Sequence, residues 1–319
     1  MVTLDDVYAA QQVIAGRLHH TPLLPSATLG ALVGAPLYLK LENLQKTGSF
    51  KPRGVLNKIA GLSAAQRERG LVAASAGNHA QAVAWAAQAL GAPCTVVMPE
   101  TAPAAKLAAT RGYGGQVVLE PGMFTLFPRA LALAEEHGYT FVHPFDDPAV
   151  IAGQGTVGLE IFEDLPTVGT VVVAAGGGGL LAGIALALKS LRPQVRVIGV
   201  EPEGASSMWQ SRQAGHAVRL DRVQTIADGL AAPFAGELCY ELIEQYVDDL
   251  VLVSEDAMRA AMVLLLERCK LLVEPGGAAA LAALLSHAIP LDPDQPVVAV
   301  VSGGNIDVAR LLQVLQPAA

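Results

Sequence analysis

Short apolar runs alternate along the chain with Ala-rich segments that have helical periodicity. The strand-like runs are LYLK (37–40), GLVAAS (70–75), CTVVM (94–98), GQVVLE (115–120), FVHP (141–144), TVVVAA (170–175), VRVIGVE (195–201), DLVLVS (249–254) and PVVAVVS (296–302). The helix-like segments include HAQAVAWAAQALG (79–91) and LLAGIALALKSL (180–191). Several strand-like runs are apolar throughout, which is typical of strands covered on both faces. The alternation predicts an α/β fold built on parallel sheet.

The alternation falls into two stretches, 70–145 and 167–302, each of which looks self-contained. The segment HPFDDP (143–148) lies between them, so we place the domain boundary near 145–150. The residues before position 50 contain only one clear strand, and we expect them to pack on one of the two units.

The composition excludes several classes of protein. Hydrophobic residues make up 52% of the 319 residues and charged residues only 16%, the reverse of a disordered chain. No apolar run favours a membrane helix, so we expect no membrane partner. The formal net charge of −8 argues against nucleic acid or an anionic membrane as a ligand.

The cysteines and the start of the chain bear on the compartment. Cys94, Cys239 and Cys269 are far apart, odd in number and form no C-x-x-C, which argues against a disulfide framework and a zinc ribbon. The opening segment carries Asp5 and Asp6 and lacks the basic region of a signal peptide. We expect a cytoplasmic location.

The segment GSFKPRG (48–54) places a lysine between a glycine turn and a proline. Pro52 suits the first turn of a helix, and apolar residues recur at helical spacing over 55–62, so Lys51 is expected at a helix N-terminus. The helix dipole disfavours an ammonium there by roughly 0.3–1 kcal/mol. A lysine of lowered pKa is what Schiff-base chemistry needs. From this motif alone, an exposed lysine at a helix start is the simpler interpretation.

Four consecutive glycines in AAGGGGLLAG (174–183) follow one predicted strand and open a helix. Such a loop exposes backbone N–H groups at the positive end of the helix, which is an arrangement that binds phosphate. No lysine follows in the Walker pattern. Gly177, Gly179 and Ala182 also fit a relaxed dinucleotide fingerprint, with Glu201 as the ribose-binding acid, so a nicotinamide or flavin enzyme is an alternative.

The segment ASAGNHAQA (74–82) has small polar residues where a strand ends and a helix begins. Ligands bind at such positions in open α/β sheets, and Gly77 lets the backbone approach a ligand. Ser75, Asn78 and His79 therefore predict an anion site suited to a carboxylate, with a helix cap as the equally good alternative.

Two further segments give weaker signals. VSGGN (301–305) places the Ser302 hydroxyl at the end of a strand near the predicted cleft, although a simple turn also explains it. The histidines form no H-E-x-x-H or other close ligand pair apart from His19–His20, so we expect no catalytic metal. Glu201 with Ser206 and Ser207 is a weak candidate for a cation site.

The motifs GSFKPRG, SAGNH, GGGGLLAG and SGGN, in this order, resemble those of the fold-type II pyridoxal-phosphate enzymes, and among them the threonine dehydratase and serine racemase group. Further segments that resemble this group are TPLLPS (21–26), LKLENLQKTGSFKPRG (39–54), HPFDDPAVIAGQGTVGLEI (143–161), IADGL (226–230) and VEPGGA (273–278). The resemblance covers nearly the whole chain and implies a tryptophan synthase beta-like α/β architecture of two open twisted sheets with helices on both faces. It implies a large cofactor-binding domain of residues 1–54 and 146–319 and a small domain of residues 55–145.

The resemblance also implies roles for single residues. Lys51 resembles the lysine that binds the cofactor and removes the substrate α-proton. Ser302 resembles the partner of the pyridine nitrogen, and a hydroxyl there does not force protonation of the ring, which favours β-elimination. The other implied cofactor-binding residues are Phe50, Asn78, Gly176, Gly177, Gly178, Gly179 and Gly229. The implied substrate-binding residues are Ser75, Gly77, Asn78 and His79.

Two positions depart from the family's pattern. Ala76 stands where the racemases have a serine that moves a proton, so a two-base racemase is not expected. Some members bind a divalent cation, and here Glu201 and Ala205 match that site but Ser207 replaces an aspartate. Pyridoxal 5′-phosphate is therefore the expected cofactor, and a divalent cation stays an open alternative.

The expected activity is that of a pyridoxal-phosphate ammonia-lyase that converts L-threonine to 2-oxobutanoate and ammonia, and L-serine to pyruvate. Because the sequence ends at Ala319 without the regulatory domain of biosynthetic threonine dehydratases, we expect a short, catabolic-type enzyme. The expected ligand is a small amino acid, and the expected assembly is a homo-oligomer, either a dimer or a tetramer.

Alternatives remain within and outside this family. Within it, the chain is a dehydratase of another β-hydroxy amino acid, such as 3-hydroxyaspartate, or a serine racemase. A nicotinamide-dependent dehydrogenase is the alternative from another class, but it leaves GSFKPRG and SAGNH unexplained. A catalytically inactive amino-acid-binding module is the third, and an intact Lys51 argues against it.

Overall fold

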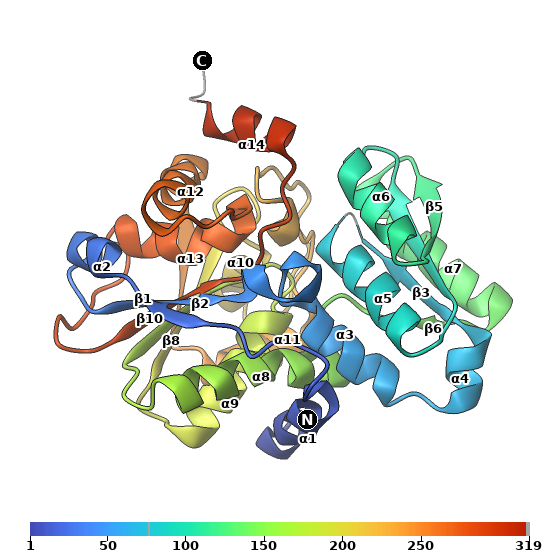
Figure 1. Cartoon of the computed structure of the whole chain (residues 1–319), viewed down its shortest axis with the longest axis horizontal. Helices are drawn as coiled ribbons and strands as arrows, with labels where there is room; N and C mark the ends of the chain where they lie inside the picture. Colours follow the sequence, from blue (N-terminus) through green and yellow to red (C-terminus); the bar gives the residue numbers. More distant parts are fainter. Residues whose placement is uncertain (76, 317–319) are drawn as a thin grey trace.

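Two separate sheets form the framework of the molecule (Figure 1). The structure is a computed structural model that describes residues 1–75 and 77–316. The larger sheet has the order β1-β2-β10-β7-β8-β9 and the smaller sheet the order β5-β4-β3-β6. Within these residues every strand pair is parallel except the edge pair of β1 with β2. The strands are β1 (Leu23–Pro25), β2 (Leu37–Leu41), β3 (Leu71–Ala74), β4 (Cys94–Pro99), β5 (Gln116–Glu120), β6 (Thr140–Phe141), β7 (Thr170–Ala174), β8 (Arg196–Pro202), β9 (Asp249–Val253) and β10 (Val297–Val301).

Helices cover both faces of each sheet, as the sequence predicts (Figure 1). The bounds of the α-helices are α1 (Leu4–Ile14), α2 (Ala27–Val33), α3 (Lys51–Ala60), α4 (Ala64–Arg69), α5 (Asn78–Ala89), α6 (Ala104–Gly112), α7 (Leu126–His137), α8 (Pro148–Asp164), α9 (Gly179–Leu191), α10 (Ser207–Ala214), α11 (Glu237–Tyr246), α12 (Glu255–Cys269), α13 (Pro275–Leu285) and α14 (Val308–Leu315). The short 3-10 segments are η1 (Glu42–Leu44), η2 (Lys46–Gly48), η3 (Met123–Thr125) and η4 (Asp228–Leu230). On the larger sheet, α1, α8, α9 and α11 cover one face, and α2, α12 and α13 the other. On the smaller sheet, α3 and α5 lie on one face and α7 on the other.

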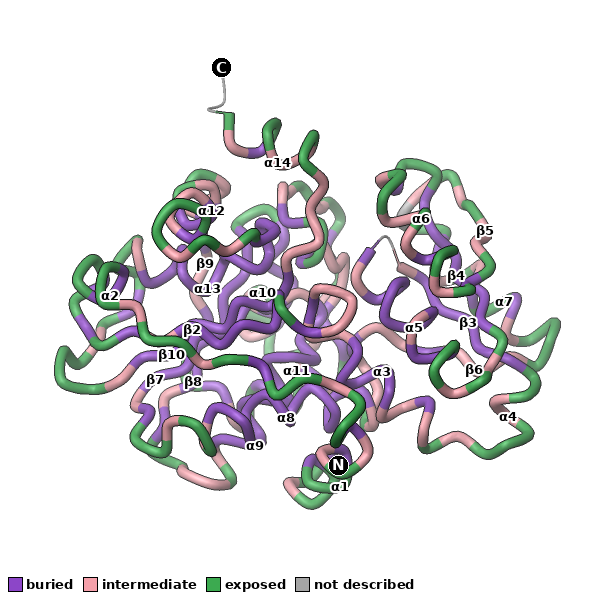
Figure 2. The backbone as a smooth tube through the Cα atoms, viewed as in Figure 1, coloured by how far each residue is buried: buried purple, intermediate pink, exposed green. Residues whose placement is uncertain are grey.

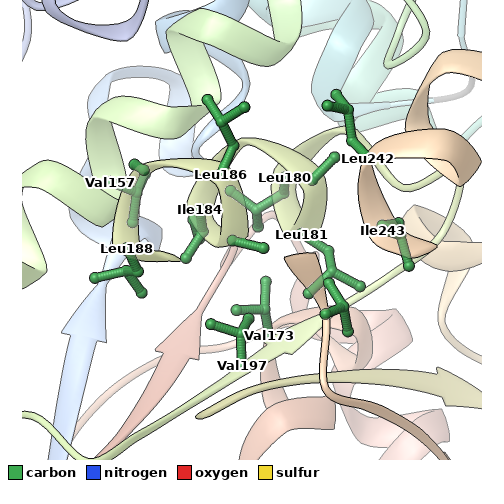
Figure 3. Close-up of a cluster of buried hydrophobic side chains, with 14 of the residues drawn as sticks. Val157, Val173, Leu180, Leu181, Ile184, Leu186, Leu188, Val197, Leu242 and Ile243 are labelled. Carbon is green, nitrogen blue, oxygen red and sulfur yellow. The ribbon is translucent and has the colours of Figure 1, made fainter. Parts of the chain in front are cut away.

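The larger core shows why the central residues of strands β7 and β8 are apolar. Val173 and Val197 pack against α9 in the cluster drawn in Figure 3, whereas Val172 and Ile198 pack on the opposite face. Successive side chains of a strand point to opposite faces, so strands covered on both sides need apolar residues at every position. Figure 2 shows these strands buried along their length, with exposed residues gathered on the outer helices and loops.

Helices α8 and α9 pack closely because small residues stand where they meet. A Cβ atom on Gly155 would lie 3.0 Å from the carbonyl oxygen of Gly183, and one on Gly158 would lie 3.0 Å from that of Ile184. Larger residues would push the two helices apart. The Ala- and Gly-rich composition of these segments therefore sets the helix spacing beneath the larger sheet.

A fully buried ion cluster ties α3 to α8 and β2. The Arg53 guanidinium lies 2.8 Å from Glu42 Oε1 and 2.6 Å from Glu160 Oε1, and Lys40 Nζ lies 2.6 Å from Glu160 Oε2. Burial would raise the pKa of Glu160, but Arg53 and Lys40 together hold this pKa below its ordinary value. The cluster fixes the first turn of α3, which begins at Lys51.

Each predicted strand-like run contains a strand, with one run clearly shorter than predicted. The prediction of strand over 141–144 was wrong beyond Phe141: the chain turns there, His143 Nδ1 accepts the N–H of Asp146 at 2.8 Å, and Pro144 has no N–H to donate. The hydrophobic pattern did not predict β1, which has only three residues and ends in Pro25. Within the described part of the chain, no helix combines the length and apolar character that a bilayer crossing requires.

Candidate active site

The predicted cofactor and substrate residues meet in one pocket, where strands of both sheets end. Ser75 follows β3 of the smaller sheet, whereas Gly176 and Ser302 follow β7 and β10 of the larger sheet. The carboxyl ends of parallel strands are where open α/β sheets bind ligands. The pocket has a volume of about 150 Å³. The predicted residues that line it are Phe50, Lys51, Ser75, Gly77, Asn78, His79, Gly176, Gly177, Gly178, Gly179, Gly229 and Ser302.

Lys51 is the first residue of α3 and its amine faces the pocket. Its Nζ donates a hydrogen bond to the carbonyl oxygen of Pro144 at 2.7 Å and lies 5.0 Å from the ring centre of Phe50. Burial lowers the pKa of Lys51 to about 8, although Cys239 and Glu274 oppose this change. A substantial fraction of the amine is therefore neutral and nucleophilic near pH 8. The alternative of an exposed lysine at a helix start is excluded.

The four glycines form a tight cradle between β7 and α9. Gly178 has a φ of 101°, in the left-handed region that favours glycine, and no side chain caps α9. A Cβ on Gly177 would overlap the Phe145 ring, and one on Gly178 would lie 2.7 Å from Met208 Cε. The backbone N–H groups of the first turn of α9 are thus presented at the positive end of the helix, which suits a phosphate.

Ser75 and residues 77–79, at the start of α5, line the pocket from the smaller sheet. Gly77 is the N-cap residue and no side chain caps this helix, so the alternative of an Asn or Ser cap was wrong. The Gly77 N–H donates to Ser75 Oγ at 3.1 Å. His79 Nε2 lies 2.8 Å from the carbonyl oxygen of Val142, and burial lowers the pKa of His79 to about 3, so this imidazole is neutral. Ala76 lies outside the described residues.

Asn78 is held at both ends of its amide by residues that the sequence reading did not single out. Its Nδ2 donates to Glu274 Oε1 at 2.5 Å, and its Oδ1 accepts a hydrogen bond from Asn305 Nδ2 at 2.8 Å. Burial raises the pKa of Glu274. A Cβ on Gly229 would meet only Glu274 and Asn78, at 3.7 and 3.9 Å, so the face between these residues is open. Glu274 lies in the motif VEPGGA, directly before a helix. This position was the sign in the sequence that Glu274 could belong to the site.

The motifs GSFKPRG (48–54) and SGGN (302–305) are joined through backbone hydrogen bonds. The Phe50 N–H donates to the carbonyl oxygen of Ser302 at 3.1 Å, and Ser49 forms an antiparallel bridge with Gly303. Ser302 is buried, and its hydroxyl is 3.4 Å from the carbonyl oxygen of Gly276, a weak hydrogen bond. The hydroxyl therefore keeps hydrogen-bonding capacity for a ligand in the pocket.

An aromatic wall is defined as Phe127, His143, Phe145 and Phe234. Its three phenylalanines line the same pocket, and His143 packs against Phe127 and Phe145. The ring centre of His143 lies 5.4 Å from that of Phe127 and 4.7 Å from that of Phe145, in edge-to-face geometry. Burial lowers the pKa of His143 to about 4, so this ring is also neutral. The aromatic wall was not predicted from the sequence, because the residues of the wall come from three distant segments.

Glu201 and its neighbours lie apart from this pocket. Glu201 is buried, and its carboxylate accepts the backbone N–H groups of Met208 and Trp209 at 2.9 and 2.7 Å. Burial raises the pKa of Glu201 to about 8. The carboxylate thus stabilises the start of α10, which argues against its role as a ribose-binding acid in a dehydrogenase. Ala205 and Ser207 are its buried neighbours, and within the described residues no three acidic, His or Cys side chains are grouped for a metal.

The donors and acceptors of the pocket fit pyridoxal phosphate, which carries a phosphate, a hydrogen-bonding ring and an aldehyde. The cradle accommodates the phosphate and the Lys51 amine suits the aldehyde. The Gln154 amide lines the pocket, is 1% exposed, and has no hydrogen-bond partner for either polar atom within the described residues. His79 Nδ1 is also buried without a partner there. Such groups are expected where a polar ligand binds.

Comparisons with known proteins show relatives over nearly the whole chain. L-threonine ammonia-lyase of Thermotoga maritima is 50% identical over 317 residues, which is 99% of this chain and 78% of that protein. The catabolic L-threonine dehydratase TdcB of Escherichia coli K12 is 44% identical over 98% of this chain and 96% of its own length.

Solved structures are also similar to this chain over nearly its whole length. Threonine deaminase of T.th. superposes with a TM-score of 0.91 at 47% identity, over 96% of this chain and 99% of that one. Maize serine racemase superposes with a TM-score of 0.94 at 39% identity, over 98% of this chain and 96% of that one. A family model described as pyridoxal-phosphate dependent enzyme matches residues 14–303. On this match and these identities, the chain belongs to the family of pyridoxal-phosphate dependent enzymes.

Proposed function

We propose that the protein is a threonine ammonia-lyase, which converts L-threonine to 2-oxobutanoate and ammonia and also accepts L-serine. The observation that carries the proposal is the position of Lys51. Its amine faces a pocket that is lined by the four glycines 176–179 and by Ser75 and residues 77–79. Relatives named as threonine ammonia-lyase or dehydratase at 44–50% identity support the choice of substrate.

Each wall of the pocket would hold one part of pyridoxal phosphate. Gly176 to Gly179 would bind the phosphate, Ser302 would meet the pyridine nitrogen, and Asn78 would donate to the ring oxygen. Phe50 and Gly229 would flank the ring. When bound, the group supplies an electron sink that stabilises negative charge at the substrate α-carbon.

Lys51 would move the protons of the reaction. With a pKa of about 8, its amine accepts the α-proton of L-threonine without being fully charged beforehand. The β-hydroxyl would then leave as water, with the proton that Lys51 has accepted. The enamine product takes up water again, so the net products are 2-oxobutanoate and ammonia. Because the amine must be neutral to accept the proton, turnover is expected to rise with pH through about 8.

The substrate carboxylate would bind segment 75–79. No side chain caps α5, so the N–H groups of its first turn are available to an anion. His79 is neutral and holds the segment to Val142, so we assign it a positioning role.

The choice between elimination and racemisation depends on Ala76. A general acid must come within about 2.6–3.2 Å of the atom it protonates, directly or through water. The methyl group of Ala76 cannot donate a proton. We expect little D-serine when L-serine is incubated with the enzyme, and a measurable amount with the Ala76→Ser variant. Chiral chromatography measures both, and abundant D-serine from the unmodified enzyme would contradict this assignment.

The remaining expectations are part of the same proposal. The large domain of 1–54 and 146–319 and the small domain of 55–145 would each contain one of the two sheets. A homo-oligomer and a cytoplasmic location stay predictions.

The direct test is to load the purified protein with pyridoxal phosphate and to measure 2-oxobutanoate and ammonia formed from L-threonine. L-serine and 3-hydroxyaspartate, each at the same concentration, serve as competing substrates. The highest kcat/KM for L-threonine is expected. A higher value for 3-hydroxyaspartate would replace the proposed substrate, and no keto acid from any of them would refute the proposed activity.

A further inference from the structure

A second lysine, Lys106 on α6, lies against the substrate segment. Its side chain is only 13% exposed and lines the pocket. A Cβ atom on Gly77 would lie 3.1 Å from Lys106 Nζ. The ammonium group is therefore beside the backbone of Gly77, in the part of the pocket assigned to the substrate carboxylate.

Lys106 has no close ion pair within the described residues, although its side chain is little exposed. Its charge also acts on the nearby Glu274 carboxyl group, whose pKa burial raises and Lys106 lowers. The ion pair of Lys106 within the described residues is with Asp228 Oδ2, at 3.9 Å, and Asp228 is itself 49% exposed. By contrast, Lys189 has a side-chain exposure of 16% and lies 2.7 Å from Asp248. The Lys106 ammonium is thus close to a carboxylate but not in hydrogen-bond contact with it.

We infer that Lys106 binds the α-carboxylate of the amino-acid substrate together with the backbone N–H groups of the first turn of α5. The inference rests on the proposed function for the reaction but concerns a residue outside the assigned machinery. A hydrogen bond between two charged groups is stronger than one from a neutral N–H, and more so in a site with little water. Gly77 fits this role, because a side chain there would occupy space next to the ammonium group.

Asp228 allows two roles of Lys106 to be distinguished: an ion pair that holds the two sheets together, or binding of the substrate. Asp228 belongs to η4, between strands β8 and β9 of the larger sheet, and Lys106 belongs to α6, between strands β4 and β5 of the smaller sheet. If the pair served to hold the two units together, removal of either charge would weaken the enzyme in the same way. If Lys106 binds the substrate, Asp228 competes for it, and removal of the aspartate charge has the opposite effect.

The first experiment compares Lys106→Met with Lys189→Met in the enzyme loaded with pyridoxal phosphate. Loss of a charged hydrogen bond should raise KM for L-threonine by about ten- to a hundredfold in Lys106→Met, with a much smaller change in kcat. L-threonine amide has no carboxylate, so its KM should be the same in the variant and the parent enzyme. Lys189→Met removes a comparable lysine outside the pocket and should change neither value. Equal changes for the acid and the amide, or a KM for L-threonine within about twofold of the parent, would overturn the inference.

The second experiment uses Asp228→Asn and a ligand that cannot react. L-alanine has no β-leaving group, so its dissociation constant, measured from the visible spectrum of the loaded enzyme, reports binding even if L-threonine is not turned over. Lys106→Met should weaken L-alanine binding, and Asp228→Asn should strengthen it. A parallel weakening in both variants would overturn the inference in favour of a pair that holds the two units together. Absence of turnover with normal L-alanine binding would instead refute the proposed activity alone.

Discussion

Two cations on the first turn of α3 have opposite environments. Arg53 lies between Glu42 and Glu160, and its guanidinium makes hydrogen bonds of 2.6–2.8 Å to both carboxylates. Burial alone would lower the pKa of Arg53, but the two carboxylates raise it instead. Lys51 has no ion pair within the described residues, and burial lowers its pKa to about 8.

The contrast separates a charge that stabilises the fold from an amine that is available for chemistry. Arg53 and its partners satisfy one another, so the cluster is stable without any ligand. Lys51 sits two positions earlier on the rigid helix that this cluster fixes, and its nearest polar partner is a neutral carbonyl group, that of Pro144. The helix therefore holds the amine in place while its proton remains exchangeable.

Replacement of Lys51 should have the largest effect on function. In Lys51→Ala we expect turnover of L-threonine to fall by at least about a thousandfold, because both the nucleophile and the base are lost. The protein should stay folded, with an unchanged circular dichroism spectrum, since the removed amine has no counter-ion in the structure. Near-normal turnover in this variant would refute the assignment of Lys51.

Replacement of Arg53 should have the largest effect on stability. Arg53→Met leaves Glu42 buried without its ion-pair partner and Glu160 with Lys40 alone, and we expect the free energy of unfolding to fall by about 3–5 kcal/mol. Arg129→Met is the matched control, because Arg129 forms an exposed pair at 3.8 Å and its loss should change stability by less than about 1 kcal/mol. Urea denaturation measures both. Equal effects would contradict the structural role of the cluster.

The stability contributed by this cluster should also depend on pH in a defined direction. The folded-state pKa of Glu160 is lower than its ordinary value of 4.5. Its contribution is therefore complete above about pH 4.5 and is lost as the pH falls through the lower, folded-state pKa. The difference in stability between the parent protein and Glu160→Gln should shrink in that acidic range, and a constant difference would contradict this account.

Replacement of a cradle glycine should weaken cofactor binding. In Gly178→Val the new side chain meets Met208 and Cys239 at a φ of 101°, a strain of about 1–3 kcal/mol. We expect the dissociation constant for pyridoxal phosphate to rise about tenfold or more. Gly215→Val is the control, because Gly215 has a φ of 75°, open space around it and no place in the pocket. If both variants lost cofactor affinity equally, strain rather than the cradle would be responsible.

Replacement of Gln154 should have the smallest effect. It should raise the stability of the cofactor-free protein but weaken cofactor binding. Its amide has no hydrogen-bond partner within residues 1–75 and 77–316, so Gln154→Leu should stabilise the cofactor-free protein by about 1 kcal/mol. The same change should weaken cofactor binding, because the pocket loses a polar group. Thermal unfolding without cofactor and spectroscopic titration with it measure the two effects. Lower stability with unchanged affinity would show that the amide serves the fold.

The sequence predicted those parts of the molecule that depend on local pattern. The apolar runs identified strands such as β7 and β10, and the glycine and proline positions placed Lys51 at the start of a helix. The residue set of the pocket came from the family resemblance, because strand order is not visible in local pattern.

Residues whose importance arises from distant contacts were missed. Glu274 lies beside Asn78, from which it is far removed in the sequence, and the aromatic wall joins three segments. Glu201 looked like a ribose-binding acid from its place after a strand, yet its carboxylate is used by the N–H groups of α10. Such partners depend on packing between elements, which periodicity does not encode.

The most direct test of the account is to identify the lysine that pyridoxal phosphate binds. The loaded enzyme is reduced with sodium borohydride, digested, and analysed by peptide mass spectrometry. The stable pyridoxyl label is expected on Lys51 and is expected to be absent from the same peptide region of Lys51→Ala. A label on another lysine, such as Lys106 or Lys40, or no label on a protein that retains full activity, would contradict the account.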